Sequence, residues 1–215
     1  MSEFERRRFL QGMAAGAAGG LMAAIKQALA ADPKSLKQGV IRLSGDVAVN
    51  GKQAAEGMAV HPGDVVTTGP VGTSVYVIGD NAFLQRPNTR IDFGDTAAAT
   101  FMRVVTGALL SVFGKGKRQI TTTVATIGIR GTGCYIEADE KKTYFCLCFG
   151  SVDLSPVNGQ TVSYSTTHHE KPLWIEDGKT MPATVMNHTD AEVIMLEALV
   201  GRPSPFPPKR FGRGY

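Results

Sequence analysis

Short runs of β-forming residues, separated by turn signals, cover most of this chain and constrain its fold more than any other feature. From residue 38 to residue 176, runs rich in Val, Ile, Thr and aromatic residues alternate with turns that contain Gly, Asn, Asp or Pro. This spacing, without amphipathic helices between the runs, is typical of an all-β domain built largely from hairpins, and it excludes a parallel βαβ architecture. The expected strands are residues 40–43, 47–49, 65–68, 75–78, 82–85, 89–93, 109–113, 120–129, 134–137 and 143–149.

One short helix is expected near the C-terminal end, at about residues 190–200. Thr189 and Glu192 have the spacing of a capping box, in which the threonine hydroxyl accepts from the third helical amide and the glutamate reaches back. Apolar side chains at helical spacing follow, and Gly201 ends the pattern. We expect this helix to pack on the sheet and close the domain.

The first thirty residues predict where the protein works. Residues 6–10 read Arg-Arg-Arg-Phe-Leu, the order typical of a twin-arginine export signal. The Ala/Gly-rich stretch 12–25 is too short and too weakly apolar for a bilayer core, which needs roughly twenty apolar residues, and small residues before Ala31 offer a cleavage site. We therefore expect a twin-arginine signal, which is either retained or cleaved. The protein should fold in the cytoplasm and then be exported to the periplasm, and we expect no transmembrane anchor after cleavage.

The distribution of charge argues against nucleic-acid binding. The formal charge of +4 comes from the signal (+2) and from residues 201–215 (+4), which leaves residues 31–200 at −2. A slightly acidic body has no electrostatic footprint for nucleic acid. The segment 201–215 holds four prolines, three glycines and four basic residues. We expect it to be a flexible, solvated tail, with contact to anionic lipid or peptidoglycan as the alternative.

The most distinctive segment is 122–137, which reads TTVATIGIRGTGCYIE. Together with PGDVVTTG at 62–69 and FGSV at 149–152, it resembles the FecR-like domain family over residues 39–153. The resemblance implies an all-β, antiparallel, partly solenoid-like module outside the cytoplasmic membrane, which in that family is often joined to a transmembrane helix and a cytoplasmic anti-sigma segment. In this chain the expected export signal precedes the domain instead of those two segments. The resemblance therefore implies a stand-alone, soluble periplasmic module that recognises a protein, cell-wall or small ligand.

The glycines of this segment predict a bend. Gly128, Gly131 and Gly133, with Thr132 between the last two, permit a positive φ or a close approach of backbones, and either would suit a corner between sheet layers. We expect these four residues to be structural rather than ligand-binding.

Arg130 is the candidate binding residue of the same segment. A guanidinium in an apolar strand requires a partner, because a buried and unpaired charge is costly. The candidates are Asp92, Asp95 and a bound anion.

The three cysteines leave three alternatives. Cys146 and Cys148 are two residues apart on one strand, so they point to the same face. A hairpin with a three-residue turn at 139–141 places Cys134 opposite Cys146, and a five-residue turn places it opposite Cys148, so that either register gathers three sulfurs on one face. The outcomes are buried free thiols, a disulfide from Cys134 to one of the others, or a metal site.

The metal alternative combines Cys146 and Cys148 with His168, His169 and His188, because thiolate and imidazole ligands suit zinc, copper or iron. Their spacing matches no recognised ligand motif. In the competing interpretation, the first two histidines lie in a solvated loop and the third simply precedes the helix. No other cofactor is expected.

The sequence does not predict an enzyme. It contains no Gly-x-Ser-x-Gly elbow and no pair of carboxylates singled out by spacing. Cys148 with His168 or His169 would form a nucleophile and base without an orienting third group. We expect a binding or signalling module, with a periplasmic metal-binding protein as the alternative.

Overall fold

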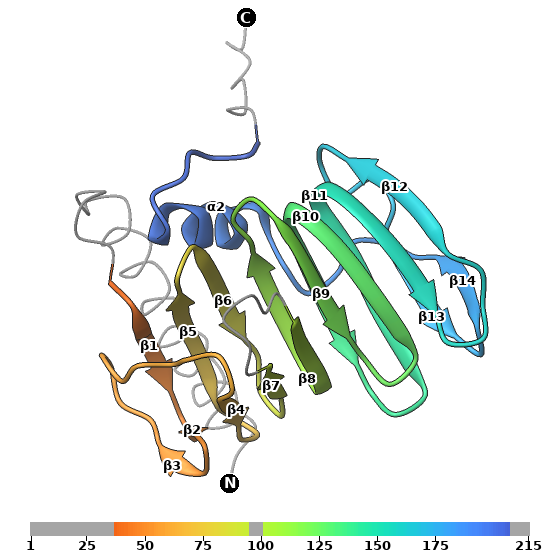
Figure 1. Cartoon of the computed structure of the whole chain (residues 1–215). Coiled ribbons are helices and arrows are strands. Elements are labelled where there is room, and N and C mark those ends of the chain that lie inside the picture. The colour runs from red at the N-terminus through yellow and green to blue at the C-terminus, as the bar shows by residue number, and fades with distance from the viewer. Residues whose placement is uncertain (1–36, 95–100, 207–215) are drawn as a thin grey trace, which may run out of the picture.

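In the part of the chain that the structure describes, the strands form one large β-sheet, and a single helix packs beside it (Figure 1). This is a computed structural model that describes residues 37–94 and 101–206; the expected export signal and residues 207–215 lie outside the described residues. The all-β fold with one short C-terminal helix is confirmed. The elements are β1 (Gly39–Ser44), β2 (Val47–Val49), β3 (Lys52–Gln53), β4 (Val65–Thr68), β5 (Thr73–Ile78), β6 (Asn81–Gln85), β7 (Arg90–Phe93), β8 (Phe101–Val112), β9 (Lys117–Thr121), β10 (Ala125–Ala138), β11 (Lys142–Pro156), β12 (Val162–Thr166), β13 (Leu173–Glu176), β14 (Lys179–Pro182) and α2 (Asp190–Leu199).

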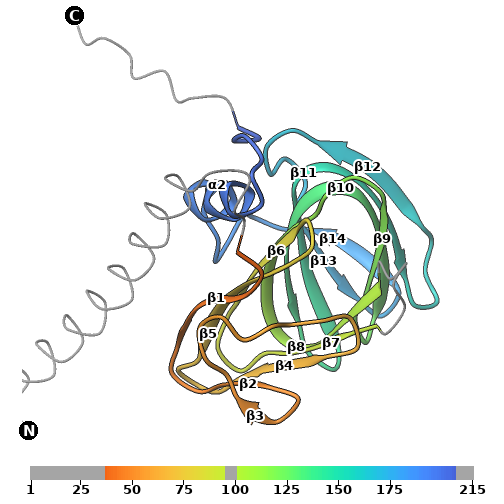
Figure 2. The same cartoon turned by 60° about the vertical axis from the view of Figure 1, so that its left-hand side comes forward.

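The sheet curls because its long central strands change partners along their length. The first half of β8 pairs with β7 and β9, and its second half pairs with β6 and β10. The first half of β10 pairs with β9, and its second half pairs with β8. Among the described strands, only β8 and β9 pair in parallel. Figure 2 shows the resulting curl, with α2 against the outside of the sheet.

Strand alternation divides the apolar side chains between two clusters. Along β10, Cys134 and Ile136 belong to the larger cluster, and Tyr135 between them belongs to the second. The second cluster, called here the helix-facing cluster, includes Val193 and Leu196 of α2. Each face of the sheet is therefore covered, which explains why its long strands carry apolar residues on both sides.

The predicted bend in β10 is present, but not all of its glycines are needed for it. The pairing with β11 shifts register on both sides of Gly133. Gly131 has φ = 58°, and a side chain at Gly133 would overlap the ring of Phe149. Gly128, in contrast, lies in regular pairing opposite Asp153, where an added Cβ would make only ordinary contacts. Thr132 is fully buried at the bend.

One expected strand is broken in two. The run 120–129 is interrupted after β9, because the hydroxyl of Thr122 accepts a hydrogen bond from the backbone amide of Ala125 at 3.1 Å and closes a turn. β10 then begins at Ala125 and continues to Ala138 through the bend, so the expected strand 134–137 is its final part.

Helix α2 begins as its capping box predicts. The amide of Glu192 donates to the Thr189 hydroxyl at 3.3 Å, and the amide of Thr189 donates to Glu192 Oε2 at 2.9 Å. Arg86 Nη2 also lies 2.8 Å from Glu192 Oε1, which fastens the start of the helix to the end of β6. In the described residues no helix is long and apolar enough to cross a membrane.

Candidate metal centre

The β10–β11 hairpin separates the three cysteines. Its turn residues are Glu140 and Lys141, and the carboxylate of Asp139 accepts the amides of Lys141 and Lys142, both at 2.8 Å. This two-residue turn pairs Cys134 with Leu147. Both expected registers are therefore wrong, since a shift of one residue moves Cys134 to the opposite face from Cys146 and Cys148.

All three cysteines are free and buried, so the disulfide alternative is not realised. Cys134 lies in the larger apolar cluster, where burial raises the pKa of its thiol. Cys146 and Cys148 lie in the helix-facing cluster, on the side where α2 packs. The sheet thus offers two sulfurs, rather than three, to a site on this face.

A loop between β12 and β13 brings His169 to these two sulfurs. Strand β12 pairs with the second half of β11 and β13 with its first part, so the loop between them passes the middle of β11. There the amide of His169 donates to the carbonyl of Cys148 at 3.0 Å. Glu170 stabilises the loop by accepting the amide and hydroxyl of Thr167 at 2.8 and 2.7 Å, and these hydrogen bonds lower the pKa of its exposed carboxylate. His169 has φ = 55°, a left-handed conformation that is uncommon outside glycine but that histidine adopts more readily than most residues.

The segment before α2 brings His188 to the same place. The ring of His188 stacks on Tyr135, with centroids 4.6 Å apart. Tyr135 is the cross-strand partner of Cys146, so this stacking holds the imidazole over the cysteine pair. His188 Nδ1 lies 2.7 Å from the carbonyl of Met186; because a carbonyl can only accept, Nδ1 donates there, and Nε2 of a neutral ring is left as a lone pair.

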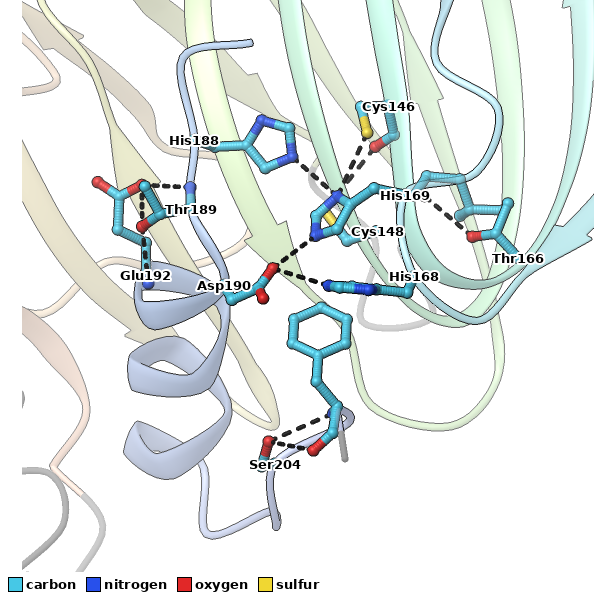
Figure 3. Close-up of polar contacts among 12 residues, drawn as sticks. Cys146, Cys148, Thr166, His168, His169, His188, Thr189, Asp190, Glu192 and Ser204 are labelled. Atoms are coloured by element: carbon cyan, nitrogen blue, oxygen red, sulfur yellow. Dashed lines mark hydrogen bonds and ion pairs between the residues drawn. The ribbon is translucent and has the colours of Figure 1, made fainter. Parts of the chain in front are cut away.

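Four potential ligand atoms meet in this buried site, as Figure 3 shows. The sulfurs of Cys146 and Cys148 and one nitrogen each of His169 and His188 all lie within 4.8 Å of one another. His169 Nδ1 is 3.1 Å from His188 Nε2 and 3.5 Å from Cys146 Sγ. We call these four residues the inner set.

The local environment favours a thiolate at Cys146. A hydrogen bond from the Cys148 thiol, with contributions from His169 and His188, lowers the pKa of Cys146 to about 3 against the opposing effect of burial. Burial and the neighbouring Cys146 raise the pKa of Cys148 well above its ordinary value. These environments favour ionisation at Cys146 and protonation at Cys148, and an ion bound by both sulfurs would displace the proton of Cys148.

A second group of ligand atoms adjoins the first and shares His169. His168 Nε2 lies 3.0 Å and His169 Nε2 lies 3.3 Å from Asp190 Oδ1, and the nearest nitrogen or oxygen atoms of all three residues lie within 4.8 Å of one another. His168 is half-exposed. Asp190 is the first residue of α2, where the helix dipole favours a carboxylate. We call these three residues the outer set.

The ring of Phe206 packs against the outer set. Its centroid is 4.6 Å from that of His168 and 5.3 Å from that of His169, and its side chain is buried. Phe206 is therefore a buried residue within the segment that was expected to be a solvated tail. The apolar ring gains burial between the imidazoles and Phe149, and a turn closed by Ser204 holds it there.

Sequence reasoning missed Asp190, Phe206 and Tyr135 as neighbours of the predicted ligands. Asp190 has a visible signal, because a carboxylate two residues after a histidine and inside a capping box lies at a helix start. Phe206 and Tyr135 have no such signal, because only the packing of the tail and the register of β10 bring them close.

Cys146, His169 and Asp190 also have the order of a nucleophile, a base and an orienting carboxylate. The Cys146 side chain is fully buried, at 0 % exposure. A reactive cysteine needs access to its substrate, and this arrangement provides none. Metal coordination makes better use of the same atoms.

Arg130 lies apart from both sets. Its side chain is 62 % exposed and pairs with Asp153 of β11 at 3.3 Å. The expectation of a guanidinium in an apolar environment is therefore wrong, because Arg130 occupies an outward position of β10. Asp92 instead pairs with Arg90, and Asp95 lies outside the described residues.

No protein-family model matches the chain, and no curated protein matches it. Two crystal structures of a candidate anti-sigma factor from Parabacteroides distasonis resemble it, with TM-scores of 0.48 and 0.47 and 8 % sequence identity. Each similarity covers 55 % of this chain and 58 % of the other. The chain thus spans little more than half the length of these neighbours, and similarity at this level does not establish a shared function.

Proposed function

We propose that the protein binds one transition-metal ion, best matched by zinc, through Cys146, Cys148, His169 and His188. The observation that supports this proposal is the spacing of the four ligand atoms. Zinc–sulfur bonds of about 2.3 Å and zinc–nitrogen bonds of about 2.0 Å in a tetrahedron imply N···N and S···N edges of about 3.3 and 3.5 Å. The distances of 3.1 and 3.5 Å at His169 Nδ1 are close to these values.

Charge supports a divalent ion at this position. Two thiolates and two neutral imidazoles carry a charge of −2, so a divalent ion makes the buried site neutral, which avoids the cost of an uncompensated buried charge. Residues beyond the ligands also support the two imidazoles as metal ligands. Met186 accepts from the second nitrogen of His188, and Asp190 lies beside the second nitrogen of His169. Such partners are typical of histidines that bind metals.

Four protein ligands leave no open coordination position, which is characteristic of structural or storage sites rather than catalytic zinc sites. We therefore propose a binding role without catalysis. Together with the export signal, the proposal is a periplasmic metal-binding protein that folds, and can be loaded, before export.

The test is metal content and cobalt spectroscopy of the purified full chain. We expect about one zinc ion per chain, and we expect Co²⁺ to give the absorption of a tetrahedral thiolate site. Cys146→Ser and His188→Ala should abolish stoichiometric binding. Cys134→Ala is the matched control, because it removes a buried cysteine from the opposite face and should bind as the wild type does. Circular dichroism verifies that each variant is folded.

Two results would contradict the proposal. The first is a wild-type chain that, after reduction and exposure to zinc, holds no stoichiometric metal. The second is a folded Cys146→Ser variant that binds zinc as tightly as Cys134→Ala does.

A second candidate function is recognition of a small or cell-wall ligand by a FecR-like module. It is favoured by a cavity of about 510 Å³ that is lined in part by Tyr135 and Asn187, a size within the range of small-molecule sites. Aromatic and polar groups line it together, among them Arg86, Tyr135, Glu137, Lys142, Trp174 and Asn187. Amphipathic aromatic side chains beside charged and amide groups suit a polar ligand with apolar faces, such as a glycan.

The single tryptophan of the chain, Trp174, reports on this cavity directly. Titration with soluble peptidoglycan fragments should change its fluorescence in a saturable way. Lys142→Ala should weaken this binding, and the exposed Lys52→Ala should leave it unchanged. A flat titration would exclude the cavity as a site for these fragments.

A further inference from the structure

We propose that His168, His169 and Asp190 form a capture site, which binds a divalent transition-metal ion first and delivers it to the inner set. This inference rests on the proposed function, because it names the route by which an ion reaches that site. The two sets share one residue, His169, whose Nδ1 faces the inner set and whose Nε2 faces Asp190. Figure 3 shows this central position of the ring.

Burial shows why a route is needed. The inner cysteines have no exposed surface, and His169 and His188 are 8 % exposed. In the outer set, the side chain of His168 is 49 % exposed and that of Asp190 is 29 % exposed. An ion arriving from solvent therefore meets the outer set before it can reach the thiolates, and the shared imidazole is the boundary between the two sets.

Hydrogen bonding in the metal-free protein prepares His169 for the outer position. His188 Nδ1 donates to Met186, so His188 Nε2 accepts, and His169 Nδ1 is the atom that donates to it at 3.1 Å. In a neutral ring, His169 Nε2 then carries the lone pair. This atom is buried, has no hydrogen bond, and lies 3.3 Å from a carboxylate oxygen of Asp190.

Two acceptors facing each other at this distance repel, and a cation between them removes the repulsion. His168 Nε2, 3.0 Å from the same carboxylate oxygen, supplies a third ligand. The outer set therefore offers two imidazole nitrogens and one carboxylate, a donor set suited to a first-row divalent ion. It contains no thiolate, so it should hold the ion more weakly than the inner set.

Because both sets use the His169 ring, an ion can occupy the inner set or the outer set but not both at once. When the ion moves inward, His169 Nδ1 must provide a lone pair, so its proton leaves and the ring becomes protonated at Nε2, beside the carboxylate of Asp190. Nε2 can then no longer bind an outer ion. Asp190 changes from a ligand of the arriving ion to a hydrogen-bond acceptor for the inner ligand, the usual partner of a zinc-bound imidazole.

Stopped-flow loading of the reduced full chain with Co²⁺ tests the proposal, because thiolate-to-cobalt absorption reports arrival at the inner set. His168→Ala should slow loading about tenfold, because the arriving ion loses one of its three outer ligands. Release to a chelator should slow by the same factor, because the end states are unchanged and only the route is impaired. His61→Ala, an exposed histidine on another part of the molecule, is the matched control and should load at the wild-type rate.

A second variant tests the outer set without the inner one. The Cys146→Ser, Cys148→Ser chain, shown by circular dichroism to be folded, should bind one Co²⁺ weakly and without thiolate absorption, and adding His168→Ala should remove this binding. If wild-type protein loads cobalt but His168→Ala loads and releases it at unchanged rates, the capture site is overturned while the inner set stands. If the wild type takes up no cobalt, the proposed function itself fails.

Discussion

Single side chains determine which atoms share a face in this protein. The carboxylate of Asp139 holds two amides of the β10–β11 turn, and the resulting two-residue turn sets the register of the whole hairpin. Cys134 is thereby kept away from Cys146 and Cys148, which remain free to face α2. At the bend of β10, Gly133 leaves room for the ring of Phe149, which in turn packs against Phe206.

The bend gives a prediction at the scale of one residue. Gly133→Ala should lower the free energy of unfolding by about 1–3 kcal/mol, because the added methyl group displaces the Phe149 ring. Gly128→Ala, five residues earlier in the same strand, should change it by less than about 0.5 kcal/mol, because its Cβ has room. Urea unfolding of both variants measures the difference, and equal effects would contradict this account of the bend.

Helix α2 is the element that connects the sheet, the metal site and the tail. Its first turn is held by Thr189 and by Arg86, and its first residue, Asp190, belongs to the outer set. At its other end, Glu197 is buried and pairs with Arg202, which also donates to the carbonyl of Asp80 at 2.6 Å. Each end of the helix is therefore fastened to the sheet by an arginine.

The ion pair between Glu197 and Arg202 predicts that removing the arginine lowers the stability of the protein by an amount that depends on pH. Burial raises the pKa of Glu197, and Arg202 opposes that shift. Arg202→Ala should cost about 1–3 kcal/mol at neutral pH, because a buried carboxylate loses its partner. A carboxyl group whose pKa is raised by folding binds more protons when folded, so stability falls as pH rises through that pKa. The defect of Arg202→Ala should therefore be smaller at pH 5 than at pH 7.

Thermal unfolding at the two pH values measures this difference. The control is Arg130→Ala, which removes an exposed ion pair with Asp153 and should change stability by no more than about 0.5 kcal/mol at either pH. A defect of Arg202→Ala that is the same at both pH values would show that Glu197 is not the group left unpaired.

At the scale of the whole molecule, the inner set connects segments that are distant in the chain. Cys146 and Cys148 belong to β11, His169 to the loop after β12, and His188 to the segment before α2. An ion bound to all four would join the outer face of the sheet to the C-terminal part of the domain. A ligand that binds only the folded state stabilises that state by mass action.

Metal removal should therefore destabilise the whole domain. At a free zinc concentration about a thousand times the dissociation constant, binding contributes about 4 kcal/mol, which corresponds to a shift on the order of 10 °C in the melting temperature of a domain of this size. Adding a chelator should lower the melting temperature of the wild type and of Cys134→Ala by this amount. Cys146→Ser should not respond, and an equal response of this variant would place the stabilising ion elsewhere.

Export is the other prediction for the whole molecule. Replacing Arg6 and Arg7 with lysine should leave the full-length protein in the cytoplasm, because the expected twin-arginine signal depends on this pair. Fractionation of cells with and without the twin-arginine translocase measures the distribution, and the Arg8→Lys variant is the matched control. Periplasmic protein in cells that lack the translocase would contradict the assignment.

The sequence by itself determined the features that depend on neighbouring residues. The β-rich runs and turn signals predicted an all-β domain, and the pattern of Thr189 and Glu192 predicted where α2 begins, because caps, turns and periodicity act over a few residues. It also named Cys146, Cys148, His168, His169 and His188 as candidate ligands. Residue types alone, however, could not show which of them meet.

Tertiary structure alone decided how these residues are grouped. A one-residue difference in the length of the hairpin turn sent Cys134 to the other face, and the crossing loop and the start of α2 placed His169 between the inner set and Asp190. The physical reason is that strand register and loop crossing depend on contacts between segments far apart in the chain, whereas a sequence pattern records only local preference. The composition of the site was therefore visible in the sequence, and its geometry arose only from the folded sheet.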